Sequence, residues 1–284
     1  MIPASFEYTA PTSVKEALSL LGAHPDAKLM AGGQSLLSMM KLRVTNPPMV
    51  VDLGRIRDLS YIREEHDRVL IGALTTHTEI ERSPVIQTRF PVLAQAVEQI
   101  GDLQVRNRGT IGGSLAHADP AADYPAAVLA LEAWMVAQGS GKPRTIPADQ
   151  FFTGLFSTAL QPGEILTEVQ IPIPPQITGS AYRKMKHPAS GFAVVGAAAV
   201  VRVGPDRREQ RVRLAFTGAA AHAFRATGVE MALRGKTLDE ATVREAMTKA
   251  TDGVELLEDL FADQAYRAQL VKVFGRRALL AAAG

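Results

Sequence analysis

The stretch RNRGTIGGSLAHADPAADY, residues 106–124, decides the fold, because one polar, poorly periodic segment holds three glycines, three hydroxyl-bearing residues and two carboxylates. Glycines let the backbone turn where side chains would clash, and they let main-chain N–H groups approach an anion closely. Asp119 and Asp123 would repel that anion, so we expect them to accept hydrogen bonds from hydroxyl or ring N–H donors. A phosphate at one end and acceptors at the other indicate a nucleotide.

A second glycine segment, AGGQS at 31–35, lies earlier in the chain. It follows a strand-like stretch at 28–30 and precedes LLSMMKL at 36–42. Two such loops can hold a diphosphate from both sides. Neither is a GxGxxG motif followed by a helix and a ribose-binding acid, and neither is GxxxxGK[ST], so the Rossmann and P-loop signatures are both missing. We therefore expect a dinucleotide that is held in another way.

The segments AGGQSLLSMMKLR at 31–43 and QVRNRGTIGGSLAHADPAADYPAAVLAL at 104–131 resemble the two FAD loops of the medium, flavin-binding subunit of molybdenum hydroxylases. That family includes aerobic carbon monoxide dehydrogenase. The resemblance covers nearly the whole chain and includes PGEIL at 162–166 and HPASGF at 187–192. Members similar to carbon monoxide dehydrogenase carry Gly-Asp-Tyr or Gly-Asp-Trp where this chain has SGF at 190–192, which weakens an assignment to carbon monoxide chemistry.

The resemblance implies an α+β protein. Its expected fold is a two-subdomain FAD-binding fold of the vanillyl-alcohol-oxidase or PCMH type, followed by a small C-terminal domain. We expect FAD-binding subdomain 1 at 1–54, FAD-binding subdomain 2 at 55–176, and a C-terminal flavoprotein domain of antiparallel sheet plus helices at 177–284. Proline-rich sequence near 172–175 ends a strand and supports the second boundary, because proline cannot donate to a ladder.

The resemblance also assigns cofactor-binding residues position by position. The first loop would offer main-chain N–H groups and a hydroxyl to the FAD diphosphate through Ala31, Gly32, Gly33, Gln34, Ser35 and Leu36. The second would clamp it from the opposite side through Gly109, Thr110, Ile111, Gly112, Gly113 and Ser114. The rest of the cofactor would meet Ile100 and Gly101 at the isoalloxazine, Asp123 at the adenosine half, and Leu166 and Lys184, which close the pocket. A cation such as Lys184 beside the pyrimidine edge stabilises the anion of the reduced ring. No side chain is assigned as an acid, a base or a metal ligand.

Composition excludes several function classes. With 284 residues, 46% of them hydrophobic, the chain can build two or three packed subdomains. The 31 Lys and Arg residues are dispersed among 29 Asp and Glu residues, so there is no electrostatic footprint for nucleic acid or an anionic membrane. No apolar run approaches the ~20 residues of a membrane span, and the N-terminus has no leader pattern. We expect a cytoplasmic location and no transmembrane segment.

The chain contains no cysteine. It therefore cannot ligate an iron–sulfur cluster through thiolates, and any clusters must belong to another subunit. The resemblance implies an oxidoreductase subunit that takes electrons from such clusters to FAD and passes them to an external acceptor. Its expected partners are a large molybdenum-cofactor subunit and a small [2Fe–2S] subunit, assembled as a dimer of heterotrimers. Two alternatives stay open, namely a stand-alone FAD-dependent reductase or oxidase and a non-catalytic FAD-binding assembly module. The substrate and the acceptor are also open.

For a few single residues, a structural role is the stronger interpretation than a functional one. His77 and His117 lie beside or within the glycine segment, yet an isolated histidine is more often a hydrogen-bonded structural residue, and their roles stay open. His187, before a proline, is predicted to be a turn residue. Trp134 follows an apolar helical stretch and is predicted to lie in the core.

Overall fold

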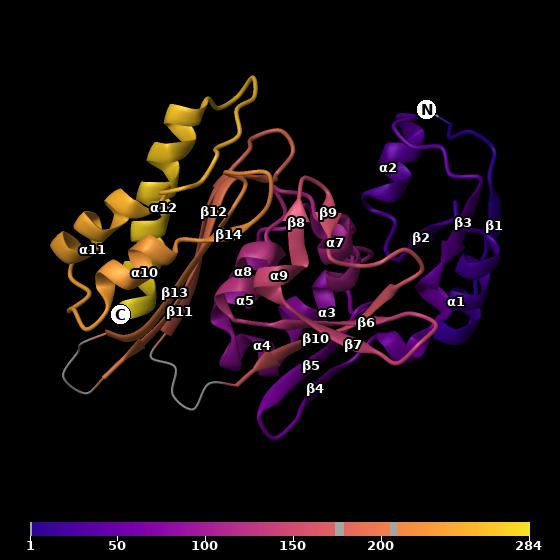
Figure 1. Cartoon of the computed structure of the whole chain (residues 1–284), viewed down its shortest axis with the longest axis horizontal. Helices are drawn as coiled ribbons and strands as arrows, with labels where there is room; N and C mark the ends of the chain where they lie inside the picture. Colours follow the sequence, from indigo (N-terminus) through magenta and orange to yellow (C-terminus); the bar gives the residue numbers. More distant parts are fainter. Residues whose placement is uncertain (1, 174–178, 205–208) are drawn as a thin grey trace.

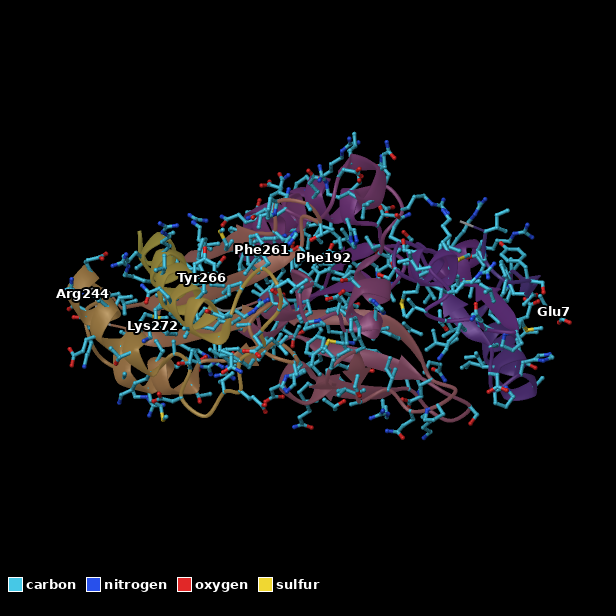
Figure 2. All side chains as sticks on the ribbon, turned by 90° about the horizontal axis from the view of Figure 1, so that it is seen from above. Glu7, Phe192, Arg244, Phe261, Tyr266 and Lys272 are labelled. Atoms are coloured by element: carbon cyan, nitrogen blue, oxygen red, sulfur yellow. The ribbon has the colours of Figure 1, made fainter. Side chains whose placement is uncertain are left out.

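The computed structural model describes residues 2–173, 179–204 and 209–284. Three sheets of three or more strands follow one another along an elongated molecule, with the N-terminal sheet at one end and the C-terminal helices at the other (Figure 1). Figure 2 shows Glu7 near one end, Arg244 near the other, and Phe192 between them. The predicted boundary between 176 and 177 lies outside the described residues.

The N-terminal part is a small parallel sheet in the order β1-β3-β2, built from β1 (Glu7–Thr9), β2 (Lys28–Met30) and β3 (Met49–Asp52). Helix α1 (Val14–Ala23) connects the first two strands, and Ser13 caps it by accepting a hydrogen bond from the Glu16 N–H. The first glycine loop leaves β2 and leads directly into α2 (Leu36–Lys41). The short 3-10 helices η1 (Leu53–Arg55) and η2 (Arg57–Leu59) then lead into the middle part.

The middle part is a five-stranded antiparallel sheet in the order β4-β5-β10-β6-β7. Its strands are β4 (Ile62–Glu64), β5 (Arg68–Gly72), β6 (Trp134–Gln138), β7 (Arg144–Pro147) and β10 (Ile165–Pro172). The strands β4 and β5 pair antiparallel and form a hairpin. The remaining elements are α3 (His77–Arg82), α4 (Pro84–Arg89), α5 (Pro91–Glu98), α6 (Leu103–Arg106), α7 (Ile111–His117), α8 (Tyr124–Ala130), α9 (Ala148–Phe151), β8 (Phe152–Gly154) and β9 (Ser157–Thr158).

The second glycine segment is more ordered than its composition indicates, because α7 occupies its centre. Thr110 caps this helix by accepting a hydrogen bond from the Gly113 N–H at 3.1 Å. The helix ends where Ala118 adopts a left-handed conformation with φ of 51°. The periodicity of the sequence hid the helix because glycines fill the positions where an apolar pattern would show.

The C-terminal part is an antiparallel sheet of β11 (Gly179–Lys186), β12 (Ala193–Val203), β13 (Glu209–Thr217) and β14 (Phe224–Arg225). Helices α10 (Thr227–Leu233), α11 (Glu240–Ala246) and α12 (Gln264–Ala283), with η3 (Met247–Lys249), form a layer that covers one face (Figure 1). The other face packs against α5 and α8, so Tyr182, Ala198 and Ala215 join the core of the middle part. This arrangement confirms the predicted sheet-plus-helices domain.

Trp134 corrects one prediction. Its side chain is 37% exposed rather than buried in the core, and the guanidinium of Arg68 lies 5.4 Å from its ring centroid. The reason is the alternation of β6, in which Met135 points into the core and its neighbour Trp134 points outward.

Candidate functional site

The two glycine loops pack backbone against backbone. A Cβ atom at Gly32 would lie 2.0 Å from the carbonyl oxygen of Arg108 and 2.7 Å from the Cα of Gly109. A Cβ atom at Gly113 would lie 3.4 Å from the Cβ of Ala31. The two loops lie about 75 residues apart in the sequence. This geometry shows that they nevertheless form one continuous surface between the N-terminal and middle parts of the chain. Only glycine at position 32 permits so close an approach.

The first loop has main-chain donors that no described residue accepts from. Among the residues that the structure describes, no atom accepts a hydrogen bond from the N–H groups of Gly32, Gly33, Gln34 or Ser35. Gly33 adopts a left-handed conformation with φ of 74°, which turns the loop before α2 begins at Leu36. Successive N–H groups without protein partners form a concavity suited to an anion such as a phosphate.

In the second loop, most main-chain N–H groups donate to acceptors within the protein. The Ile111 N–H donates to the Thr75 carbonyl at 3.1 Å, and the Gly112 N–H donates to the Ala73 carbonyl at 2.9 Å. The Gly113 N–H is taken by the cap at Thr110. Ile111, Gly112 and Gly113 therefore shape the second loop, and their N–H groups are already occupied.

Two groups of the second loop stay available to a ligand. The Thr110 N–H donates to none of the described residues, and the Ser114 hydroxyl has no hydrogen-bond partner among them. The resemblance predicted six binding residues here, and the structure divides them into these two and the residues that support them. Sequence alone could not make this division, because it does not reveal that the segment pairs with residues 73–75.

His77 supports the same loop from beneath. Its side chain is buried, its Nδ1 lies 3.0 Å from the Tyr124 hydroxyl, and a Cβ atom on Gly109 would lie only 2.5 Å from its Nε2. Burial, with a smaller contribution from the charge of Arg106, lowers the pKa of His77 to about 4. His77 is thus a neutral structural residue at neutral pH. His117, at the end of α7, stacks against Phe156 with ring centroids 5.2 Å apart.

Asp123 is the centre of a buried network at the seam with the C-terminal sheet. Its carboxylate accepts a hydrogen bond from the Tyr182 hydroxyl at 2.6 Å and lies 2.8 Å from the ammonium nitrogen of Lys184. Lys184 Nζ also donates to the Gln99 carbonyl at 3.1 Å. The Asp123 and Lys184 side chains are 4% and 0% exposed, so a complete ion pair is shielded from water.

Burial governs the proton affinities of this network. It raises the pKa of Asp123 and lowers the pKa of Lys184, because each charge is costly away from water. The ion pair opposes both shifts, and the Tyr182 hydroxyl also opposes the shift at Asp123. Burial and the neighbouring carboxylate raise the pKa of Tyr182 well above its usual value, so its hydroxyl stays a donor. Asp123 was expected to serve ligand donors, but here its two oxygens already serve protein donors.

The remaining predicted residues lie around this network and the second loop. Ile100 and Gly101 directly follow Gln99, and Gly101 adopts φ of 43° against the side chain of Val105. Leu166 is buried on β10 and precedes Thr167, whose carbonyl accepts a hydrogen bond from the N–H of Ala73 at 2.9 Å. Ala73 thus links β10 at Thr167 to Gly112, and Leu166 lies in the same buried core.

The segment 119–123 joins the glycine loop to the C-terminal part. Thr217 Oγ1 lies 2.7 Å from the carbonyl oxygens of both Pro120 and Ala122, and its single proton is shared between them. A cavity of about 260 Å³ opens at this seam, between residues 119–121 and the turn at 187–192. The predicted turn at His187 is confirmed, because its Nδ1 accepts hydrogen bonds from two following main-chain N–H groups at 3.2 Å each. Half-exposed Phe192 ends that turn (Figure 2).

Two family models match the chain. Residues 4–174 match the FAD binding domain in molybdopterin dehydrogenase, and residues 180–282 match the CO dehydrogenase flavoprotein C-terminal domain. Together they cover both the two glycine loops and the sheet that carries Lys184. The chain belongs to this family of FAD-binding molybdenum hydroxylase subunits.

Relatives of this flavoprotein serve different dehydrogenases. The chain is 44% identical over 283 residues to the carbon monoxide dehydrogenase medium chain of Hydrogenophaga pseudoflava, covering 99% of this chain and 98% of that protein. It is 33% identical to the glyceraldehyde dehydrogenase medium chain of Sulfolobus acidocaldarius, covering 98% of each. The chain is thus an oxidoreductase subunit of the medium, FAD-binding type.

Solved structures give the same result for the fold. The carbon monoxide dehydrogenase of H. pseudoflava that lacks the Mo-pyranopterin moiety superposes with a TM-score of 0.95 at 44% identity, covering 99% of this chain and 98% of that one. Quinoline 2-oxidoreductase from Pseudomonas putida 86 superposes with a TM-score of 0.94 at 34% identity, covering 100% and 98%. The predicted α+β flavoprotein fold is confirmed.

The residues present fit FAD. The first loop supplies unpartnered N–H groups for a diphosphate, and a Cβ atom at Gly32 would push the two loops apart. Within residues 2–173, 179–204 and 209–284, no cluster of three His, Asp or Glu side chains could hold a metal ion, and no helix is long and apolar enough to cross a membrane.

Sequence reasoning missed Tyr182 and Tyr124 as part of the site. The signal was the alternation of Tyr182, Lys184 and Lys186, which places all three on one side of β11.

Proposed function

We propose that this flavoprotein carries electrons from iron–sulfur clusters on a partner subunit to an external acceptor, within a molybdenum hydroxylase complex. Bound FAD supplies the electron-transfer chemistry, since a flavin accepts and releases electrons singly or in pairs. The chain itself holds the diphosphate between its two loops and fixes a positive charge near the ring. We assign no side chain as a general acid or base.

The observation that carries the proposal is the backbone contact between the two glycine loops. Gly32 against Arg108 creates one surface with open N–H donors at Gly33, Gln34, Ser35 and Thr110, which suits a diphosphate. Helix α7 leads from the second loop toward Asp123, which lies 2.8 Å from the ammonium nitrogen of Lys184 at the seam. We propose that the diphosphate binds at the loops and that the flavin ring lies toward Lys184, Ile100 and Gly101.

We propose a large molybdenum-cofactor subunit and a small [2Fe–2S] subunit as partners, in a dimer of heterotrimers. The relatives named above as medium chains support this assembly, and the absence of cysteine means that this chain cannot supply thiolates to a cluster. The division at 54 and 176 into two FAD subdomains and a C-terminal domain is part of the proposal, and the three sheets support it. A cytoplasmic location stays a prediction.

Rapid mixing of the isolated complex tests the proposal. The complex is made anaerobic and mixed with its substrate, while visible absorption follows the clusters and the flavin separately. We expect the flavin to be reduced after the clusters and to be reoxidised when an acceptor is added. In a complex carrying Gly32→Ala, which should weaken flavin binding, we expect cluster reduction to persist and electron delivery to the acceptor to fall in proportion to the flavin content.

The same experiment separates the two alternatives. Turnover of a reduced substrate by the isolated, FAD-loaded chain, without any partner, would favour a stand-alone reductase or oxidase. Bound flavin that stays oxidised while the partner's clusters are fully reduced would favour a non-catalytic FAD-binding module. Either outcome would overturn the electron-transfer proposal while leaving FAD binding intact.

A further inference from the structure

Tyr182 lies at the buried end of a row of polar side chains on β11. Tyr182, Lys184 and Lys186 occupy alternate positions and therefore share one side of the strand. The first is fully buried, the second has a fully shielded side chain, and the third is exposed. Across the seam, Asp123 at the start of α8 meets the first two.

We propose that Tyr182 is a positioning residue that keeps the Asp123–Lys184 pair ionised, so that Lys184 presents a full positive charge to the flavin. This inference rests on the proposed function. It adds to that function the device by which the chain would set the reduction potential of its cofactor. Tyr182 acts through Lys184 and need not touch the flavin itself.

A buried acid–base pair can exist in two protonation states. In one, Asp123 is a carboxylate and Lys184 an ammonium. In the other, the proton has left Lys184 Nζ for an oxygen of Asp123, and both groups are neutral without any net gain or loss of protons. Burial favours the neutral pair, because it raises the pKa of Asp123 and lowers that of Lys184.

The Tyr182 hydroxyl favours the ionised pair. It donates to Asp123 at 2.6 Å, and hydrogen bonds donated to a carboxylate stabilise its charged form. The Gln99 carbonyl accepts from Lys184 at 3.1 Å and stabilises the ammonium. The remaining charged group that acts on the pair is Lys186, which lowers the pKa of both partners.

The structure holds the tyrosine in place for this task. Its main-chain N–H donates to Gln95 Oε1 at 2.9 Å. A Cβ atom on Gly196 of the neighbouring strand would lie 2.1 Å from the Tyr182 hydroxyl, so glycine there makes room for the hydroxyl group. The raised pKa of Tyr182 keeps the hydroxyl protonated and able to donate.

The consequence concerns the flavin potential. A fixed cation in a site shielded from water interacts strongly with charge that develops on a nearby cofactor. Reduction increases the negative charge on a flavin, so the Lys184 ammonium favours the reduced state. If the proton moves to Asp123, this stabilisation disappears and the reduction potential becomes more negative.

The test is the midpoint potential of FAD in the holo complex, measured by spectroelectrochemistry for the wild type and Tyr182→Phe. We expect Tyr182→Phe to retain FAD and to shift the potential to a more negative value. Infrared spectra should also gain a protonated-carboxyl band that Asp123→Asn removes. Tyr61→Phe is the matched control, because it also deletes a tyrosine hydroxyl that donates to a carboxylate, that of Glu168, and it should leave the potential unchanged.

A second set of variants tests whether the effect passes through Lys184. Lys184→Gln should shift the potential in the same direction, and adding Tyr182→Phe to it should produce no further shift. Replacement of Tyr182 by 4-aminophenylalanine, a weaker donor, should also shift the potential in the negative direction, and it decides the matter if Tyr182→Phe does not fold.

Three results would overturn the inference while leaving the proposed function intact. They are an unchanged potential in FAD-loaded Tyr182→Phe, a further shift when Tyr182→Phe is added to Lys184→Gln, and a 4-aminophenylalanine variant whose potential equals that of the wild type. A wild-type complex that holds no FAD would instead contradict the proposed function, and this inference would fall with it.

Discussion

The α-carbon of Gly32 faces the carbonyl oxygen of Arg108 so closely that a Cβ atom there would lie 2.0 Å from it. Main chain from two distant loops thus meets with no side chain between. This contact fixes the spacing of the two loops and hence the width of the surface on which the open N–H donors of the first loop lie. The two loops must keep this spacing if a diphosphate is to bind donors from both of them.

Gly32→Ala should separate the loops. We expect FAD affinity to fall by about tenfold or more and the free energy of unfolding to drop by about 1–3 kcal/mol, the usual cost of overpacking. Fluorescence titration with FAD and urea unfolding measure the two effects. Gly141→Ala is the matched control, because a Cβ atom at Gly141 meets nothing within 4 Å. Wild-type affinity in Gly32→Ala would show that the loop contact does not shape the site.

Acid should destabilise the protein through His77. Its pKa is lowered to about 4 by burial, against about 6.5 in the unfolded chain, so the unfolded state binds more protons between these values. The contribution of neutral His77 is complete above pH 6.5 and is lost as the pH falls toward 4, by about 3 kcal/mol at most. Urea unfolding of the apo chain at a series of pH values measures it.

The His77→Gln variant isolates that contribution from the carboxylates that also titrate in acid. We expect the variant to be less stable than the wild type at pH 7, since packing against Tyr124 and Gly109 is lost. We also expect its stability to fall less steeply between pH 6.5 and 4. Parallel curves for the two proteins would mean that His77 titrates normally in the folded state.

Asp123→Ala should leave the Lys184 cation buried without its counter-ion. Breaking one side of a buried pair costs about 3–5 kcal/mol, whereas removing both charges costs less. We therefore expect the double variant Asp123→Ala with Lys184→Met to be more stable than Asp123→Ala alone in urea unfolding. A double variant that is less stable than either single variant would argue against a buried ion pair.

Thr217 should hold the 119–123 segment against the C-terminal sheet. Thr217→Val keeps the shape of the side chain but leaves the carbonyls of Pro120 and Ala122 without this donor. We expect a loss of about 1–3 kcal/mol in the free energy of unfolding. Hydrogen exchange should show faster opening at Gly218, whose N–H donates to Pro120 at 2.7 Å. Unchanged exchange there would mean that the seam does not depend on Thr217.

Sequence predicted those features of the fold that depend on local pattern. The strand at 28–30 follows from local pattern and the C-terminal sheet and helices follow from the resemblance, and the structure has both. The strand β11 was missed, because its polar alternate residues do not read as a half-buried strand until α5 and α8 are placed against them. Trp134 was misplaced for a similar reason, since only the register of β6 decides which way it points.

For the site as well, sequence predicts the local features and misses the long-range contacts. The glycines of both loops are visible as sequence, but their mutual contact joins residues 32 and 108 and needs the tertiary structure. The donors of Ile111 and Gly112 are spent on Thr75 and Ala73, which no local pattern reveals. Likewise, the Tyr182 hydroxyl reaches Asp123 across 59 positions of sequence. Local composition therefore indicates a nucleotide loop, whereas long-range pairing decides which atoms can bind.

Quantification of FAD in the chain expressed alone, by visible absorption after mixing and desalting and by chromatography of the released nucleotide, tests the central claim most directly. The account predicts about one FAD retained per chain, and clearly less in Gly32→Ala. A folded wild-type chain that stays colourless, both alone and when purified with its partner subunits, would contradict it.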